Sequence, residues 1–308
     1  MKKIFLISIF YIFFFCSNSF AFIEFKQSKV ISDDTPGVRG INFKPDGTIM
    51  YVTGRRDVDG DTVIQYSLTT PFDISTATKT SETVLAIDGD NKIDKPHAIE
   101  FKPDGKVMYV IHSLSNIESV EQFDLAIAWD TSSLTYNTRF KVLNGDLQLR
   151  GLTFKPDGTR MYIGQTNYGK VLQYDLATPW DVSSATNLVE SSSYLSQENN
   201  IRNIQFTSDG TIMYLGGNGG DDINKYTLST AWDVSTLEHI TSYSVSAQTG
   251  ATGTIMTGFI FAASFTKLYV THDAGTVNTI FEYSVACAGI ITCDPINDKD
   301  ITAIIEAN

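Results

Sequence analysis

The sequence predicts an all-β fold, a five-bladed β-propeller of four-stranded blades that is closed by the N-terminal strand. Two observations carry this prediction. A segment of the form FKPDGTxMYV recurs along the 308 residues in five copies, the fifth of which keeps only its outline. The anchoring phenylalanines lie 52 to 58 residues apart, and a period of this size is typical of propellers and solenoids. A second segment, an aromatic strand usually followed by a Trp-Asp loop, follows each copy. The anchors are Phe43, Phe101, Phe154, Phe206 and Phe261.

Each repeat has the pattern of four short strands. In the first repeat a strand ends at Phe43, and the Lys-Pro-Asp-Gly turn that follows combines a preset φ, a self-bonding aspartate and a glycine for the left-handed position. Residues 50–52 begin the second strand, 63–68 form the third and 81–87 the fourth. Four antiparallel strands bury both faces only when they stack radially on other blades.

The two ends of the repeat array are complementary. The last repeat has three strands and stops near Val285, whereas residues 22–31 form a spare strand before the first full repeat. Pairing these segments removes the open edges, so we expect five blades in a closed ring.

The termini predict an exported protein. Residues 1–21 have the basic start, apolar run and small-x-small site of a secretory signal, and no later apolar run is long enough to span a membrane. We expect the propeller over 22–286 and a tail over 287–308, in which Cys287 and Cys293 form a local disulfide in an oxidising compartment. The location would be periplasmic, extracellular or at the cell surface.

The charge of the chain limits its partners. The net charge is −12, which argues against nucleic acid and suits a solvated protein or one that uses cations. A protein or glycan outside the cytoplasm is the expected partner.

The repeat core resembles that of a known group of propellers. FKPDGTxMYV is similar to the F-S-P-D-G-x-x-x-Y-V blades of YVTN-type and lactonase-like β-propellers, and residues 51–53 and 269–271, both Tyr-Val-Thr, come closest. The resemblance covers nearly the whole chain after residue 21. It implies the fold and transfers no catalytic residue, because propellers serve as enzymes, binders and scaffolds.

Aligned repeats place cationic side chains at one height near the mouth of the central channel. The position four residues before each anchoring phenylalanine is occupied by Arg39, His97, Arg150, Arg202 and Thr257. This ring predicts either a site for a carboxylate, sulfate or phosphate, or bonds that join neighbouring blades. One residue before the phenylalanines, Glu100 is the single acid facing the channel, which is too few for a glycosidase pair.

A second aligned column contains His112, Gln165 and His272, three residues after each conserved tyrosine. We include these side chains in the predicted ligand-binding face, although the two histidines lie on blades too far apart for a shared metal.

Acidic loops on the same face have two interpretations. Aspartates at alternate positions with glycine suit calcium, but aspartate is also a good turn former. The candidate calcium ligands are Asp57, Asp59, Asp61, Asp88, Asp90 and Asp94.

The repeated aromatics of the Trp-Asp loops are expected to pack rather than to bind sugars. They are Phe72, Trp129, Trp180 and Trp232.

No nucleophile elbow, zinc-binding helix motif or P-loop occurs. The sequence therefore favours a secreted binding module that presents variable loops and no catalysis. A structural module of a surface or envelope protein, and a lactonase-like or other hydrolase with an arginine-lined channel mouth, are the alternatives.

Overall fold

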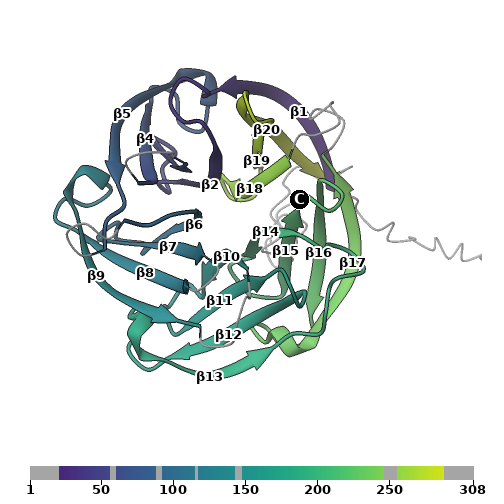
Figure 1. Cartoon of the computed structure of the whole chain (residues 1–308). Helices are drawn as coiled ribbons and strands as arrows, with labels where there is room; N and C mark the ends of the chain where they lie inside the picture. The colour runs from purple at the N-terminus through teal and green to yellow at the C-terminus, as the bar shows by residue number, and fades with distance from the viewer. Residues whose placement is uncertain are drawn as a thin grey trace, which may run out of the picture.

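The computed structural model is a closed ring of five four-stranded antiparallel sheets arranged around a central axis (Figure 1). It describes residues 21–55, 60–87, 92–114, 117–142, 148–245 and 255–287. The predicted fold class is confirmed. Within these ranges no helix is long and apolar enough to cross a membrane.

Four blades have their strands in sequence order from the axis outward. Blade 1 contains β2 (Val38–Phe43), β3 (Ile49–Gly54), β4 (Thr62–Leu68) and β5 (Ala77–Val84). Blade 2 contains β6 (Pro96–Phe101), β7 (Val107–Leu114), β8 (Ile117–Leu125) and β9 (Leu134–Lys141). Blade 3 contains β10 (Leu149–Phe154), β11 (Arg160–Gln165), β12 (Lys170–Leu176) and β13 (Ala185–Glu190). Blade 4 contains β14 (Ile201–Phe206), β15 (Ile212–Gly217), β16 (Asp222–Leu228) and β17 (Leu237–Ser244).

The fifth blade is built from both ends of the chain. Strands β18 (Ile255–Ala262), β19 (Lys267–Asp273) and β20 (Asn278–Cys287) run outward from the axis, and β1 (Ala21–Val30) pairs antiparallel with β20 as the outermost strand. Phe22 lies opposite Ala286 and Val30 lies opposite Thr279. The predicted closure is therefore confirmed.

A short 3-10 turn joins the third and fourth strands of each of the first four blades. These turns are η1 (Ile74–Thr76), η2 (Thr131–Ser133), η3 (Val182–Ser184) and η4 (Val234–Thr236). Each is capped by the aspartate of the Trp-Asp loop, whose side chain accepts a hydrogen bond from a backbone N–H two residues later.

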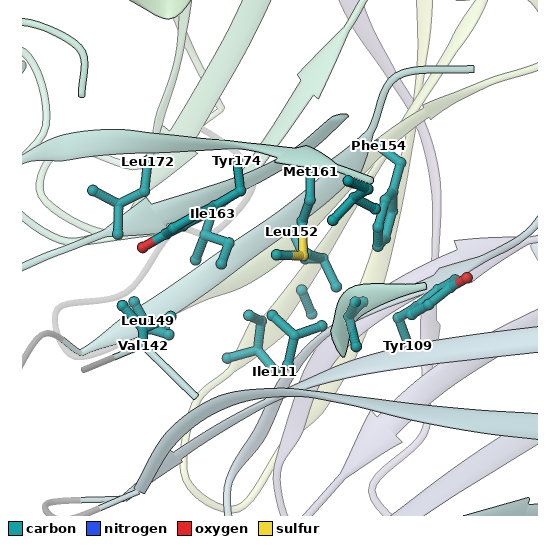
Figure 2. Close-up of a cluster of buried hydrophobic side chains, with 14 residues drawn as sticks. Tyr109, Ile111, Val142, Leu149, Leu152, Phe154, Met161, Ile163, Leu172 and Tyr174 are labelled. Carbon is teal, nitrogen blue, oxygen red and sulfur yellow. The ribbon is translucent and has the colours of Figure 1, made fainter. Parts of the chain in front are cut away.

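The core lies in the seams between blades. Figure 2 shows the seam between blades 2 and 3, where Tyr109 and Ile111 of β7 pack against Leu152, Met161 and Ile163 of the next blade. Each seam buries apolar side chains from two blades, so a single blade has no complete core of its own.

The same three aromatic rings meet at every seam. The conserved tyrosine of one blade lies 4.4 to 4.6 Å, between ring centroids, from the anchoring phenylalanine of the next blade. That phenylalanine lies 5.3 to 5.7 Å from a third ring of its own blade, which is Phe72, Trp129, Trp180, Trp232 or Phe265. The expected packing role of the loop aromatics is confirmed.

A backbone constraint holds the third ring in place. Phe72, Trp129, Trp180 and Trp232 have φ values of 60 to 69°, a left-handed conformation that is rare for such residues. Their N–H groups donate to the carbonyl of the turn glycine, and a Cβ on Gly105 would lie 2.3 Å from the Trp129 ring. The Lys-Pro-Asp-Gly turn needs glycine both for its φ of +71° and for this ring.

A tyrosine hydroxyl donates a hydrogen bond across four of the five seams. Tyr51, Tyr109, Tyr162 and Tyr269 donate to the carbonyl of the third ring's residue in the next blade, at 2.5 to 2.8 Å. Blade 5 lacks the Trp-Asp loop, and Tyr214, which faces it, forms no such bond within the described residues.

We therefore expect Tyr109→Phe to lower the free energy of unfolding by about 1 kcal/mol, because the Trp180 carbonyl loses its donor. Denaturant unfolding measures this difference. Tyr214→Phe is the matched control and should change stability by less than half as much; equal losses in the two variants would show that the hydroxyl bond is unimportant.

Candidate functional site

The mouth of the central channel is built by the five innermost strands, each of which contains a β-bulge. In β6 the pairing register with β7 shifts between Pro96 and Ile99, and the other four inner strands have equivalent shifts. Regular alternation would direct His97 and Glu100 to opposite faces of the blade. The bulge resets the alternation, so that both positions can face the channel.

Small residues allow the inner strands to approach closely at this level. A Cβ on Gly40 would lie 2.3 Å from the His97 carbonyl, and one on Gly258 would lie 2.6 Å from the Arg39 carbonyl. The backbones of neighbouring blades are thus nearly in contact, which narrows the channel and brings the side chains at the mouth together.

Two members of the predicted ring are in contact. The Arg39 guanidinium lies 3.4 Å from His97 Nδ1 across the seam between blades 1 and 2. His97 is 3% exposed, and its pKa is lowered well below the usual value by burial and by the positive charges of Arg150, Arg39 and Arg202. The positive charges of guanidinium groups from blades 1, 3 and 4 therefore all act on the His97 imidazole.

The three arginines differ in how they are bound. Arg150 donates from Nη1 to Ser113 Oγ at 2.9 Å and to its neighbour's carbonyl at 3.2 Å, so it joins blades 2 and 3 as expected of a seam residue. Arg202 has no hydrogen bond from its guanidinium to any described residue. Burial and the nearby Arg39 charge lower the pKa of Arg202 to about 10, although Glu198 acts in the opposite direction.

Glu100 lies deeper in the channel. It is partly exposed, and its Oε2 accepts a hydrogen bond of 3.1 Å from Asn42 Nδ2 on the adjacent inner strand. Burial raises the pKa of Glu100 to about 8, while the Asn42 bond opposes this rise. Its carboxyl therefore changes charge close to neutral pH.

The other inner positions at the level of Glu100 carry no carboxyl. Gln205 exchanges two hydrogen bonds with the backbone of Phe261, at 2.9 and 2.7 Å, which gives it a structural role. Thr153 and Ile260 are buried.

The second predicted column lies inside the blades. His112 and His272 are each 2% exposed, and Gln165 is 4% exposed. His112 Nδ1 lies 3.5 Å from Glu121 Oε1, and His272 Nε2 lies 3.9 Å from Asp221 Oδ2. The structure does not bring the two histidines together.

The predicted calcium ligands are only partly described. Asp57, Asp59, Asp88 and Asp90 lie outside the described residues. Asp61 is 1% exposed, and its Oδ2 accepts the Lys95 N–H at 2.7 Å, at the entry to blade 2; Asp94 is exposed. Among the described residues no group of three or more His, Cys, Asp or Glu side chains could hold a metal ion. Calcium binding remains a prediction.

The sequence analysis did not predict that the Asp61 side chain joins two neighbouring blades by a hydrogen bond. Its counterparts Glu118, Asp221 and Asn278 likewise accept a backbone N–H at the start of the following blade's inner strand, from Leu149, Met256 and Val38. All four stand two residues before a fully buried residue of a third strand, in a column that the aligned repeats contain; the buried residues are Val63, Val120, Ile223 and Ile280.

No protein-family model matches the chain, and no curated protein is detectably similar to it in sequence. Solved structures are similar in fold. They include a periplasmic gluconolactonase of Pseudomonas aeruginosa, with 15% identity over 76% of this chain and 64% of that one and a TM-score of 0.48. A putative 6-phosphogluconolactonase from Bacteroides uniformis has 13% identity over 81% and 70% of the chains and a TM-score of 0.45. Hydrazine synthase of Kuenenia stuttgartiensis has 14% identity over 82% and 71%, with a TM-score of 0.47.

These neighbours correct the main functional expectation. The sequence favoured a binding module without catalysis, and the comparisons do not support that interpretation: the structures of similar fold named above are described as a gluconolactonase, a putative 6-phosphogluconolactonase and a hydrazine synthase. The chain spans less than two thirds of the Pseudomonas protein. A likeness at this identity shows the fold alone, so the activity has to be inferred from the residues of this chain.

The raised pKa of Glu100 predicts how stability depends on pH. Because the folded state holds this proton more tightly than the unfolded state, the stabilisation is complete below pH 4.5 and is lost as the pH rises through about 8. Glu100→Gln keeps the shape and cannot ionise, so at pH 9 its melting midpoint should exceed that of the wild type by about 2 °C or more. At pH 4 the two midpoints should coincide; a constant difference between pH 4 and 9 would contradict the assignment.

Proposed function

We propose that the chain is a lactonase-like hydrolase that cleaves a lactone or ester in the central channel, with Glu100 as the proton-transferring group. The observation that carries the proposal is that Glu100, the single carboxyl in the five described inner strands, has its pKa raised to about 8 by burial. A carboxyl of this kind is suited to general acid–base catalysis near neutral pH.

The chemistry requires one proton-transferring group rather than two. Water attacks the carbonyl carbon and gives a proton to the Glu100 carboxylate, the C–O bond to the alcohol oxygen breaks, and that oxygen takes the proton back. The product of a lactone is a hydroxy acid. Glycoside hydrolysis would require a second carboxyl, and the other inner positions at the level of Glu100 have none.

The neighbours of Glu100 support this role. Asn42 Nδ2 donates to Oε2 and thereby orients the carboxyl group. The guanidinium groups of Arg39 and Arg202 at the mouth can stabilise the negative charge that develops on the carbonyl oxygen, or hold the substrate.

We place this activity outside the cytoplasm, on the basis of the secretory signal expected in residues 1–21. These residues are outside the described part of the chain, so export, and any glycan or protein contacted there, rest on the sequence.

Hydrolysis of a lactone panel, followed by acid release, tests the proposal. The rate should rise with pH through about 8 as Glu100 loses its proton, and Glu100→Gln should lower kcat by about a hundredfold or more. Glu190→Gln, which changes a surface glutamate paired with Lys170, is the matched control and should retain full activity. A Glu100→Gln variant with the wild-type rate and pH profile would exclude this role for Glu100.

A further inference from the structure

The seam between blades 3 and 4 binds a guanidinium group of the chain itself. Arg160, the first residue of β11, donates from Nε to Asp175 Oδ1 and from Nη1 to the Trp232 carbonyl, each at 3.0 Å. The carboxylate lies opposite it on β12 of the same blade, and the carbonyl belongs to the aromatic loop of the next blade. The second oxygen of Asp175, Oδ2, accepts a hydrogen bond of 3.3 Å from Asn187.

The seam between blades 2 and 3 has the same carboxylate without the cation. Val107 is the residue equivalent to Arg160, two positions before the seam tyrosine, and it lies opposite Asp124 in the register of β7 and β8. Asn137 donates to Asp124 Oδ2 at 2.7 Å, and Oδ1 has no hydrogen-bond donor among the described residues. The oxygen that binds the guanidinium in one seam is thus unused in the other.

The Trp180 carbonyl likewise accepts one donor fewer than its counterpart. The Trp232 carbonyl accepts both the Tyr162 hydroxyl and Arg160. The Trp180 carbonyl accepts the Tyr109 hydroxyl at 2.6 Å and no second donor within the described part of the chain. Because a carbonyl oxygen has two lone pairs, one remains for a ligand.

A cleft of about 450 Å³ lies among these residues. Val107, Asn137 and Trp180 line it. A valine side chain ends at Cγ, whereas an arginine at the same position reaches the carbonyl of the next blade, so the substitution of one residue type for the other in the repeat explains why this seam is open.

The charge around the cleft favours a cation. Burial and the negative charges of three carboxylates raise the pKa of the Tyr109 hydroxyl. These carboxylates belong to Asp104, Asp124 and Asp181. Lys102 also lines the cleft, but its Nζ pairs with Asp104 Oδ2 at 3.0 Å. The lysine of the corresponding turn in blade 3 is paired in the same way, so this lysine is compatible with a guanidinium in the seam.

At the other seams the cation and the carboxylate occur together or are both missing. In the seam between blades 5 and 1, Lys267 donates to the Phe72 carbonyl at 2.9 Å and to Glu282 at 2.6 Å. In the two remaining seams an isoleucine lies opposite a hydroxyl residue. These pairs are Ile49 with Ser67 and Ile212 with Thr227. Among the seams described, the one between blades 2 and 3 alone has the carboxylate and no cation.

We propose that the cleft between blades 2 and 3 binds a guanidinium group, which an arginine side chain of a protein partner supplies. Asp124 Oδ1 and the Trp180 carbonyl accept its N–H donors, in the manner that Arg160 is bound one seam further on. The net charge of −12 favours a basic partner. Val107 follows the Lys-Pro-Asp-Gly turn, so the cleft lies at the turn end of the seam, away from the channel mouth, and the inference is independent of the proposed hydrolysis.

A guanidinium supplied by the chain itself tests the acceptors. Val107→Arg introduces one opposite Asp124, and Ile49→Arg is the matched control because Ser67 lies opposite it in place of a carboxylate. The melting midpoint of Val107→Arg should exceed that of Ile49→Arg by about 3 °C, and the addition of Asp124→Asn should remove the difference. Equal midpoints of the two single variants would overturn the assignment of the acceptors.

Binding is measured with the peptide acetyl-Gly-Arg-Gly-amide, by tryptophan fluorescence, since Trp180 lines the cleft. The same peptide with citrulline, which keeps the shape of arginine without its charge, is the control. The wild type should bind the arginine peptide at least tenfold more tightly, and Asp124→Asn should weaken this binding about tenfold. Val107→Arg should not bind it, because its own side chain occupies the site. Asp124→Asn introduces no new cation and tests the site even if Val107→Arg does not fold.

The outcomes are distinct from those for the proposed function. Equal binding of the arginine and citrulline peptides, or binding that Asp124→Asn retains in full, would overturn the site. Tighter binding of ethylguanidinium than of the peptide would overturn the protein partner in favour of a small ligand. Asp124→Asn should hydrolyse lactones at the wild-type rate, so a failure of the hydrolase proposal leaves the guanidinium site unaffected.

Discussion

The stack of tyrosine, phenylalanine and a third aromatic ring at each seam is the contact on which the architecture depends. The tyrosine comes from one blade and the other two rings from the next, so the contact exists only between blades. It explains why the turn glycine and the loop tryptophan recur together, since the ring occupies the space that a Cβ on the glycine would fill. Because these rings lie toward the turn end of the blades, the opposite loops are free to vary.

The close packing of the blades also determines which side chains lie together around the central axis. The inner strands approach so closely at Gly40 and Gly258 that their side chains meet at one level. Because arginine recurs at this position in three of the five repeats, several guanidinium groups lie at the same level, and each loses part of its solvation. In this ring, one arginine is bound across a seam by Ser113, and another has no hydrogen-bonded partner among the described residues. The same repeated position therefore has different hydrogen-bond partners in different blades.

The repeats were sufficient to predict the blades and the ring closure, and of the predicted ring of side chains the structure brings Arg39 and His97 into contact. They could not separate Arg150 from Arg202, because the difference lies in partners from other blades, such as Ser113. The bulge between Pro96 and Ile99 leaves no mark in the residue pattern, although it directs His97 and Glu100. The pKa of Glu100 depends on its burial and on a hydrogen bond from Asn42 of the adjacent blade, which no single repeat contains. The residues whose side chains join neighbouring blades form, by contrast, a column in the aligned repeats. Its first member, Asp61, was interpreted as a calcium ligand.

The pairing of β1 with β20 also determines the order in which the fold can form. Among the described strands, residues 21–30 pair only with residues 279–287, so the largest loop closure comes with the last described strand to be synthesised. Until then β20 is absent, β1 has an unpaired edge, and the seam between blades 5 and 1 is open. Cooperative stability therefore belongs to the complete ring, and a chain without β1 or β20 would have an incomplete blade 5 beside the seam that contains Arg39.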